Sequence, residues 1–135
     1  METDFYPRFY QLFEHLAVTV DPDAFIALQD ELLAAENDAE RLIKYVEKHL
    51  SAQELENYYE VFAPVYPEET LALFKKALIP YAEKNVGRRH YEYILELLRK
   101  MSRIQGGKTE ALDLAADFRI RYRNRKAMLE VLSQL

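Results

Sequence analysis

The chain has 135 residues, of which half are apolar and 30% are charged, and it contains no cysteine. This balance indicates one globular domain over residues 1–135, and the missing cysteine excludes disulfides, thiolate nucleophiles and cysteine-ligated zinc or iron–sulfur sites. No stretch is typical of a signal peptide, and no apolar run reaches the roughly 20 residues of a membrane span. We therefore expect a soluble cytoplasmic protein with no membrane partner.

Charge is divided unevenly along the chain. Residues 1–83 carry 6 Lys/Arg and 17 Asp/Glu, a net charge of −11, whereas residues 84–135 carry 12 Lys/Arg and 6 Asp/Glu, a net charge of +6. Two solvated faces of opposite sign are the simpler interpretation, but such asymmetry also marks partner surfaces. In an elongated stack of helices, one end would be negative and the other positive. That arrangement predicts salt-sensitive self-association, end to end, at low ionic strength.

Apolar residues recur three and four positions apart, which predicts an all-α fold of about eight short helices. The first is expected over about residues 4–17. The second follows Asp21-Pro22, an N-cap followed by a proline suited to the first helical position. Asn37 with Glu40 three residues later resembles a capping box and predicts the start of a third helix.

Ser51 with Glu54 repeats the capping-box pattern and predicts a fourth helix. Pro67 begins the fifth, and Pro80 is expected to kink or end it, because proline lacks the backbone donor and clashes with the preceding turn. The sixth helix is expected over about residues 88–104.

Gly106-Gly107 predicts a helix stop, Thr109 the cap of a seventh helix, and Asn124 the start of an eighth. Because the connections are short, neighbouring helices should be antiparallel hairpins. The hairpin starts are spaced as in two-helix repeats, so the first choice is a degenerate helical-repeat stack similar to tetratricopeptide or HEAT units. A plain orthogonal bundle is the second choice.

No residue pattern indicates catalysis. His15, His49 and His90 lie on three different predicted helices, and no His-x-x-x-His or Glu-x-x-His pair places two ligands on one face. No glycine-rich phosphate loop or nucleophile motif occurs either. We therefore expect a protein that is not an enzyme and has no metal site and no cofactor.

The segment from Arg119 to Lys126 is the strongest local feature, with five cations in eight residues. The cations could contact phosphates while Tyr122 stacks on a base, or they could serve the end of a helix and pair with the acidic half. Tyrosines of adjacent hairpins could line a groove for a peptide. The candidate interaction surface comprises Arg88, Arg89, Tyr91, Tyr93, Arg119, Arg121, Tyr122, Arg123, Arg125 and Lys126.

Part of the chain resembles a known family. The runs are Tyr81-Ala-Glu-Lys-Asn85, Gly87-Arg-Arg-His-Tyr91, Leu97-Leu-Arg-Lys-Met101, Phe118-Arg119, Tyr122-Arg-Asn-Arg125 and Met128-Leu129. Together they are similar to the C-terminal helical region of bacterial SWIM zinc-finger proteins, over about residues 81–132. The zinc motif of that family, Cys-x-Cys…Cys-x-His, is absent. The resemblance implies a protein-interaction scaffold without assigned chemistry, either excised from a larger protein or a stand-alone relative.

The sequence thus favours a non-enzymatic helical-repeat module that binds another protein or another domain of its own polypeptide. The alternative is an accessory domain that binds nucleic acid through Arg119 to Lys126 together with Arg88 and Arg89. The position of the basic residues separates the two hypotheses: a convergent positive strip favours nucleic acid, and internally paired arginines favour the scaffold.

Overall fold

The computed structural model describes residues 22–135, and within its first helix it describes side chains from Gln29 onward. This part of the chain is helical and contains no strand, which confirms the all-α class. Six helices occur here where seven were predicted; the predicted helix over residues 4–17 and the Asp21 cap lie outside the described residues. The helices are α2 (Pro22–Lys48), α3 (Ala52–Phe62), α4 (Pro67–Lys84), α5 (Arg88–Ser102), α6 (Gly107–Arg121) and α7 (Lys126–Leu132).

Helix α2 is continuous over 27 residues, so the predicted break at Asn37 is wrong. Neither glycine nor proline follows Pro22 within the helix, and side-chain pairs at helical spacing stabilise it directly after Asn37. Arg41 pairs with Asp38 at 2.5 Å, and Lys44 pairs with Glu40 at 2.9 Å. The Glu40 carboxylate thus bonds forward along the helix, and Asn37 is an exposed residue in mid-helix.

Two predicted helix starts are confirmed. Ser51 is the N-cap of α3, and its Oγ accepts a hydrogen bond from the Glu54 backbone N–H at 3.1 Å. Pro67 is the first residue of α4, where its missing N–H costs nothing. Pro80, however, does not end α4, which continues to Lys84. Pro80 is exposed, while the residues two before and two after it are buried, so packing holds the helix against the core across the proline.

Two glycines turn the chain between α5 and α6. Helix α6 begins at Gly107, so Thr109 lies inside its first turn and is not its cap. Gly106 is the N-cap and has φ of 78°, a left-handed conformation that glycine adopts at little cost. Gly107 is buried, and a Cβ there would overlap the Met101 carbonyl oxygen. The start of α6 is therefore pressed directly onto the end of α5.

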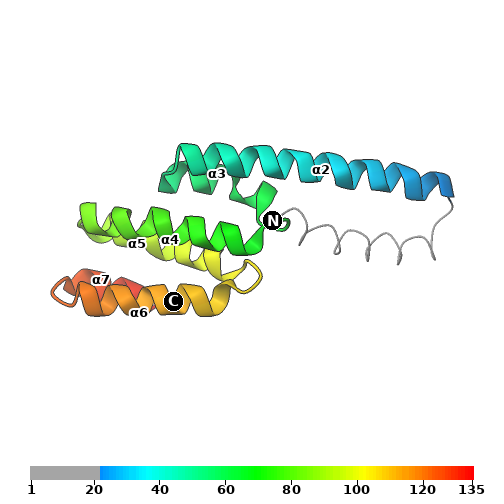
Figure 1. Cartoon of the computed structure of the whole chain (residues 1–135). Coiled ribbons are helices and arrows are strands. Elements are labelled where there is room, and N and C mark those ends of the chain that lie inside the picture. Colours follow the sequence, from blue (N-terminus) through cyan, green and yellow to red (C-terminus); the bar gives the residue numbers. More distant parts are fainter. Residues whose placement is uncertain (1–21) are drawn as a thin grey trace.

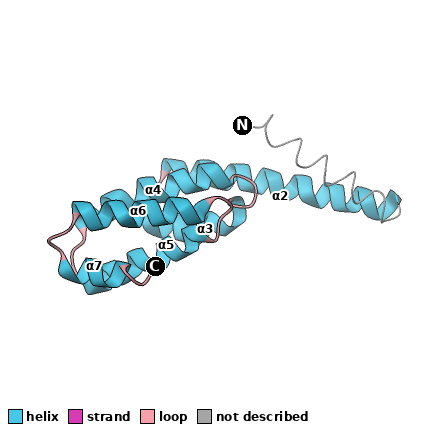
Figure 2. Ribbon diagram, turned by 90° about the horizontal axis from the view of Figure 1, so that it is seen from below, coloured by secondary structure: helices cyan, strands magenta, loops and turns pink. Residues whose placement is uncertain are grey.

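The helices form three layers in chain order: α2 with α3, α4 with α5, and α6 with α7 (Figure 1). Helix α3 packs on α2 and α4, and α5 packs on α4, α6 and α7, so α3 and α5 join the layers. The N-terminal part of α2 extends beyond the other helices (Figures 1 and 2). One apolar core runs through all three layers; its largest fully buried side chains include Ile43, Leu55, Phe62, Phe74, Leu78, Ile94, Leu98, Met101, Phe118 and Leu132.

Candidate interaction surface

The basic segment ends α6 and starts α7, and its last arginine is held by the fold. Helix α7 begins at Lys126 with Arg125 as its N-cap, not at Asn124. The Arg125 Nη1 donates to the Ala82 carbonyl oxygen at 2.6 Å, and its Nη2 lies 3.4 Å from the Glu83 carbonyl oxygen. These carbonyls belong to the last turn of α4, where a cation also meets the negative end of the helix dipole. The same guanidinium lies 4.1 Å from the centroid of the Tyr122 ring.

Three more arginines of the predicted surface have internal partners. Arg119 is half-buried and donates to the Leu132 carbonyl oxygen at 3.1 Å, close to the end of α7. Arg121 pairs with Asp117 at 3.6 Å along α6. Arg88 pairs with Glu130 at 2.9 Å and so links α5 to α7. Each of these cations stabilises a helix end or joins two elements.

The ten predicted surface residues differ in exposure. Tyr91 is only 2% exposed and belongs to the core, and Tyr122 is half-buried beneath Arg125. Within residues 22–135, Arg89, Arg123 and Lys126 are exposed and have no ion pair or hydrogen bond. Four of the seven cations in the predicted set thus have partners inside the fold, and three do not.

A hollow of about 470 Å³ opens where the start of α3 meets the end of α4 and the start of α5. Of its lining residues, sequence reasoning had singled out Arg89 and Tyr93 for the interaction surface. The others come from elements far apart in the sequence, and no local pattern marks them as neighbours. The hollow is lined by Ser51, Ala52, Gln53, Tyr81, Arg89, His90 and Tyr93.

Aromatic side chains line this hollow. The Tyr81 hydroxyl forms a hydrogen bond of 2.8 Å with His90 Nδ1, and the rings of Tyr81 and Tyr93 lie 5.3 Å apart. Burial raises the pKa of the Tyr81 phenol, and the nearby Arg89 charge opposes that rise only in part. The wall thus presents neutral phenols beside one exposed guanidinium.

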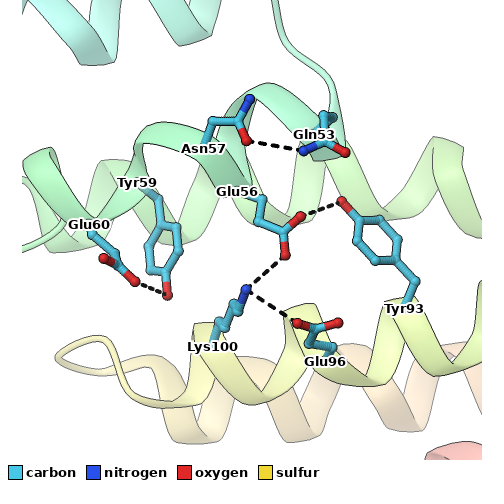
Figure 3. A network of polar contacts seen from close by, with 8 residues as sticks. All are labelled: Gln53, Glu56, Asn57, Tyr59, Glu60, Tyr93, Glu96 and Lys100. Atoms are coloured by element: carbon cyan, nitrogen blue, oxygen red, sulfur yellow. Dashed lines mark hydrogen bonds and ion pairs between the residues drawn. The ribbon is translucent and has the colours of Figure 1, made fainter.

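A polar network behind the hollow fixes the position of Tyr93 (Figure 3). Glu56 on α3 accepts hydrogen bonds from the Tyr93 hydroxyl at 3.0 Å and from Lys100 Nζ at 2.7 Å. Lys100 also lies 3.4 Å from Glu96, one turn away on α5. The side chains of Glu56 and Lys100 are only 19% and 23% exposed. One carboxylate therefore anchors two residues of α5 in partly desolvated surroundings, where charged hydrogen bonds are strong.

The network also shifts two proton equilibria. Burial, together with the hydrogen bond to Glu56, raises the pKa of Tyr93. The hydrogen bond to Glu56 raises the pKa of Lys100 despite an opposing effect of burial. Near neutral pH, both groups are therefore held in their protonated, donating forms.

Other features of the described residues give less support for a binding site. A hollow of about 540 Å³ lies between α4 and α6, and an ion pair between Lys75 and Glu110 borders it. No group of three or more His, Asp or Glu residues within 22–135 is placed to hold a metal ion. None of the helices in that range is long and apolar enough to cross a membrane.

The chain matches no family model, and neither a curated protein nor a solved structure matches it.

Proposed function

We propose that this chain is a non-enzymatic, degenerate helical-repeat module that binds a segment of another protein, or of another part of its own polypeptide. The supporting observation is the aromatic hollow, which lies at the seam of two layers and is backed by the Glu56 network. Interaction surfaces of stacked helical hairpins form across such seams. A wall held by hydrogen bonds and packing binds without a large ordering cost.

The chemistry of the hollow suits a peptide. Tyr81 and Tyr93 offer apolar ring area with polar edges, Gln53 offers an amide for a peptide backbone, and Arg89 offers a cation. The preferred segment should therefore carry an apolar or aromatic residue next to an acidic one. The resemblance of residues 81–132 to the SWIM helical region implies the same scaffold role.

The same residues do not suit catalysis. No carboxylate lines the hollow, and the Ser51 hydroxyl accepts the Glu54 amide as a helix cap. His90 Nδ1 is already bound by Tyr81. Burial raises the pKa of the Tyr81 phenol, so this pair does not favour a phenolate nucleophile.

A phage-displayed random peptide library, selected on the immobilised chain, tests the proposal. We expect enrichment of peptides that combine aromatic and acidic residues. Measured as synthetic peptides, they should bind at least about tenfold more weakly to Arg89→Glu and to Gln53→Arg. Lys76→Glu, a charge reversal at an exposed residue of α4 outside the hollow, is the matched control and should bind normally. Failure to enrich any peptide, or binding that ignores the hollow variants, would count against the proposal.

A further inference from the structure

The aromatic hollow is one end of a longer seam between α3 and α5. Contacts between these two helices advance together along both of them, so the helices run in the same direction. The start of α3 lines the aromatic hollow with the start of α5, and Glu56 in the middle of α3 bonds Tyr93 and Lys100 (Figure 3). The ends of the two helices line a further hollow of about 360 Å³, here called the distal hollow.

The distal hollow combines an apolar lining with an excess of positive charge. Its apolar lining includes three residues that are each no more than 8% exposed: Tyr59, Ala63 and Ile104. Its charged lining residues are two cations, Lys100 and Arg103, and one carboxylate, Glu60. The aromatic hollow is lined by the cation Arg89 and by no carboxylate. Both hollows are therefore positive on a protein whose net charge is −5, and both suit acidic side chains.

Each hollow holds one exposed arginine, Arg89 in the aromatic hollow and Arg103 in the distal hollow. Neither side chain has an ion pair or hydrogen bond within residues 22–135. Burial raises the pKa of Tyr59, and the charges of Lys100 and Arg103 oppose that rise in part, just as Arg89 acts on Tyr81 in the aromatic hollow. Each guanidinium thus lies near a phenol of its own hollow and is available to an acidic partner.

The two arginines lie on the same side of α5. They are 14 residues apart, close to four helical turns, and Tyr93, Glu96 and Lys100 fall between them at steps of three and four residues. Arg103, the C-cap of α5, keeps the helical conformation, so the two positions are about 21 Å apart along the axis. An extended chain rises about 3.3 Å per residue, so about six residues span this distance. Residues six apart also point to the same side of an extended chain.

We infer that the partner of this chain is an extended segment that lies along the seam, with two acidic side chains six residues apart on Arg89 and Arg103 and an apolar side chain in each hollow. The inference rests on the proposed function and specifies the partner that it requires. Between the hollows, Lys100 is already paired with Glu56 and Glu96, so the middle of the segment should be uncharged. This polar middle also offers no continuous apolar groove of the kind that binds a helix.

Synthetic peptides of one composition that differ only in the spacing of two acidic residues test the inference. Each peptide carries an aromatic residue beside each acid and uncharged residues elsewhere, and its binding to the full chain is measured by fluorescence anisotropy at about 0.15 M salt. We expect the peptide with acids six residues apart to bind at least about tenfold more tightly than peptides with acids two or ten apart, because it alone engages both arginines.

Charge reversals separate the two anchors. Arg103→Glu should weaken binding of the six-spaced peptide at least about tenfold and change that of the two-spaced peptide, which reaches only the aromatic hollow, by less than about twofold. Arg89→Glu should weaken both. Arg123→Glu is the matched control, because it makes the same charge change at an exposed arginine between α6 and α7, and it should alter neither. Circular dichroism checks that each variant keeps its helices.

The outcomes distinguish this inference from the proposed function. Equal binding at all spacings, lost in Arg89→Glu but unchanged in Arg103→Glu, would overturn the inference and leave the proposed function standing. No binding by any peptide, or binding that ignores both variants, would contradict both. A loss in Arg123→Glu as large as that in Arg103→Glu would reveal general attraction to anions, and tighter binding of a helical peptide with acids 14 residues apart would replace the extended segment with a helix; either result would overturn the inference.

Discussion

At the scale of single residues, Glu56 shows how one side chain ties two helices together. It is the common acceptor for Tyr93 and Lys100, both from α5, and it lies on α3 (Figure 3). Loss of one donor leaves a partly buried carboxylate with fewer hydrogen bonds, which costs more than the net value of an average hydrogen bond. The network is thus a sensitive point for stability.

We expect Tyr93→Phe to lower the free energy of unfolding by about 1–2 kcal/mol at pH 7, measured by urea denaturation. Tyr58→Phe, on α3, is the control, because no hydrogen bond of the Tyr58 hydroxyl occurs in the described residues. It should change the free energy by less than about 0.5 kcal/mol. Equal losses in the two variants would show that the Glu56 contact contributes nothing specific.

The same network predicts the pH dependence of stability. Tyr93 and Lys100 have pKa values raised in the folded state, so folding favours their protonated forms. Their contribution should be complete below pH about 10, near their ordinary pKa values, and should decline as the pH rises further. Urea denaturation at pH 7, 9 and above 10 should show a flat region and then a loss that Tyr93→Phe reduces.

Residue-level contacts were also the part of the molecule that the sequence predicted least. Arg125 looks like a phosphate-binding residue within a basic run, yet its guanidinium binds the Ala82 carbonyl. That partner is a backbone atom 43 residues earlier, and no side-chain pattern marks it. The hollow is similar: Gln53 and His90 line it together only because the start of α3 lies near the start of α5, which is a property of the tertiary fold.

At the scale of helices, sequence patterns predicted class and most positions but not every boundary. Caps whose side chain bonds the local backbone, such as Ser51, were predicted correctly. Asn37 carried the same local pattern, but helix-forming residues on both sides outweighed it. Pro80 was outweighed by the buried residues around it, since tertiary packing overrides local preference.

The turn into α6 gives a prediction about backbone approach. Gly→Ala inside a helix normally stabilises by up to about 1 kcal/mol, but the Cβ at Gly107 would overlap the Met101 carbonyl and press on Leu71. We therefore expect Gly107→Ala to destabilise by about 2–3 kcal/mol in thermal or urea unfolding. Gly106→Asn is the comparison, because asparagine tolerates the left-handed backbone; it should cost less than about 1 kcal/mol. A neutral Gly107→Ala would mean that α6 can move off α5 freely.

At the scale of the whole molecule, the charges of the chain become ordered in space. The α2 and α3 layer, residues 22–62, carries ten Asp/Glu and three Lys/Arg. The α6 and α7 layer, residues 107–132, carries four Asp/Glu and six Lys/Arg. Three of the six cations of the α6 and α7 layer, Arg119, Arg121 and Arg125, have partners inside the fold. Long-range attraction to a polyanion is further opposed by the net charge of −5.

We therefore predict no submicromolar binding to single- or double-stranded oligonucleotides at about 0.15 M salt, measured by fluorescence anisotropy. Arg123→Glu combined with Lys126→Glu is the informative variant, because these two cations are exposed and form no ion pair or hydrogen bond within residues 22–135. Tight binding that falls steeply with salt and disappears in this variant would favour the nucleic-acid hypothesis over the peptide-binding one.

The layered order of the helices also has a consequence for how the chain folds. Because each layer packs mainly on the next one along the chain, most contacts join residues that are near one another in sequence. Such topologies fold fast, since little loop-closure entropy is lost before native contacts form. The middle pair, α4 and α5, supports both outer pairs, so it is the natural nucleus, and opening should begin at the outer layers. The chain should then fold from the middle pair outward and open from the outer pairs inward.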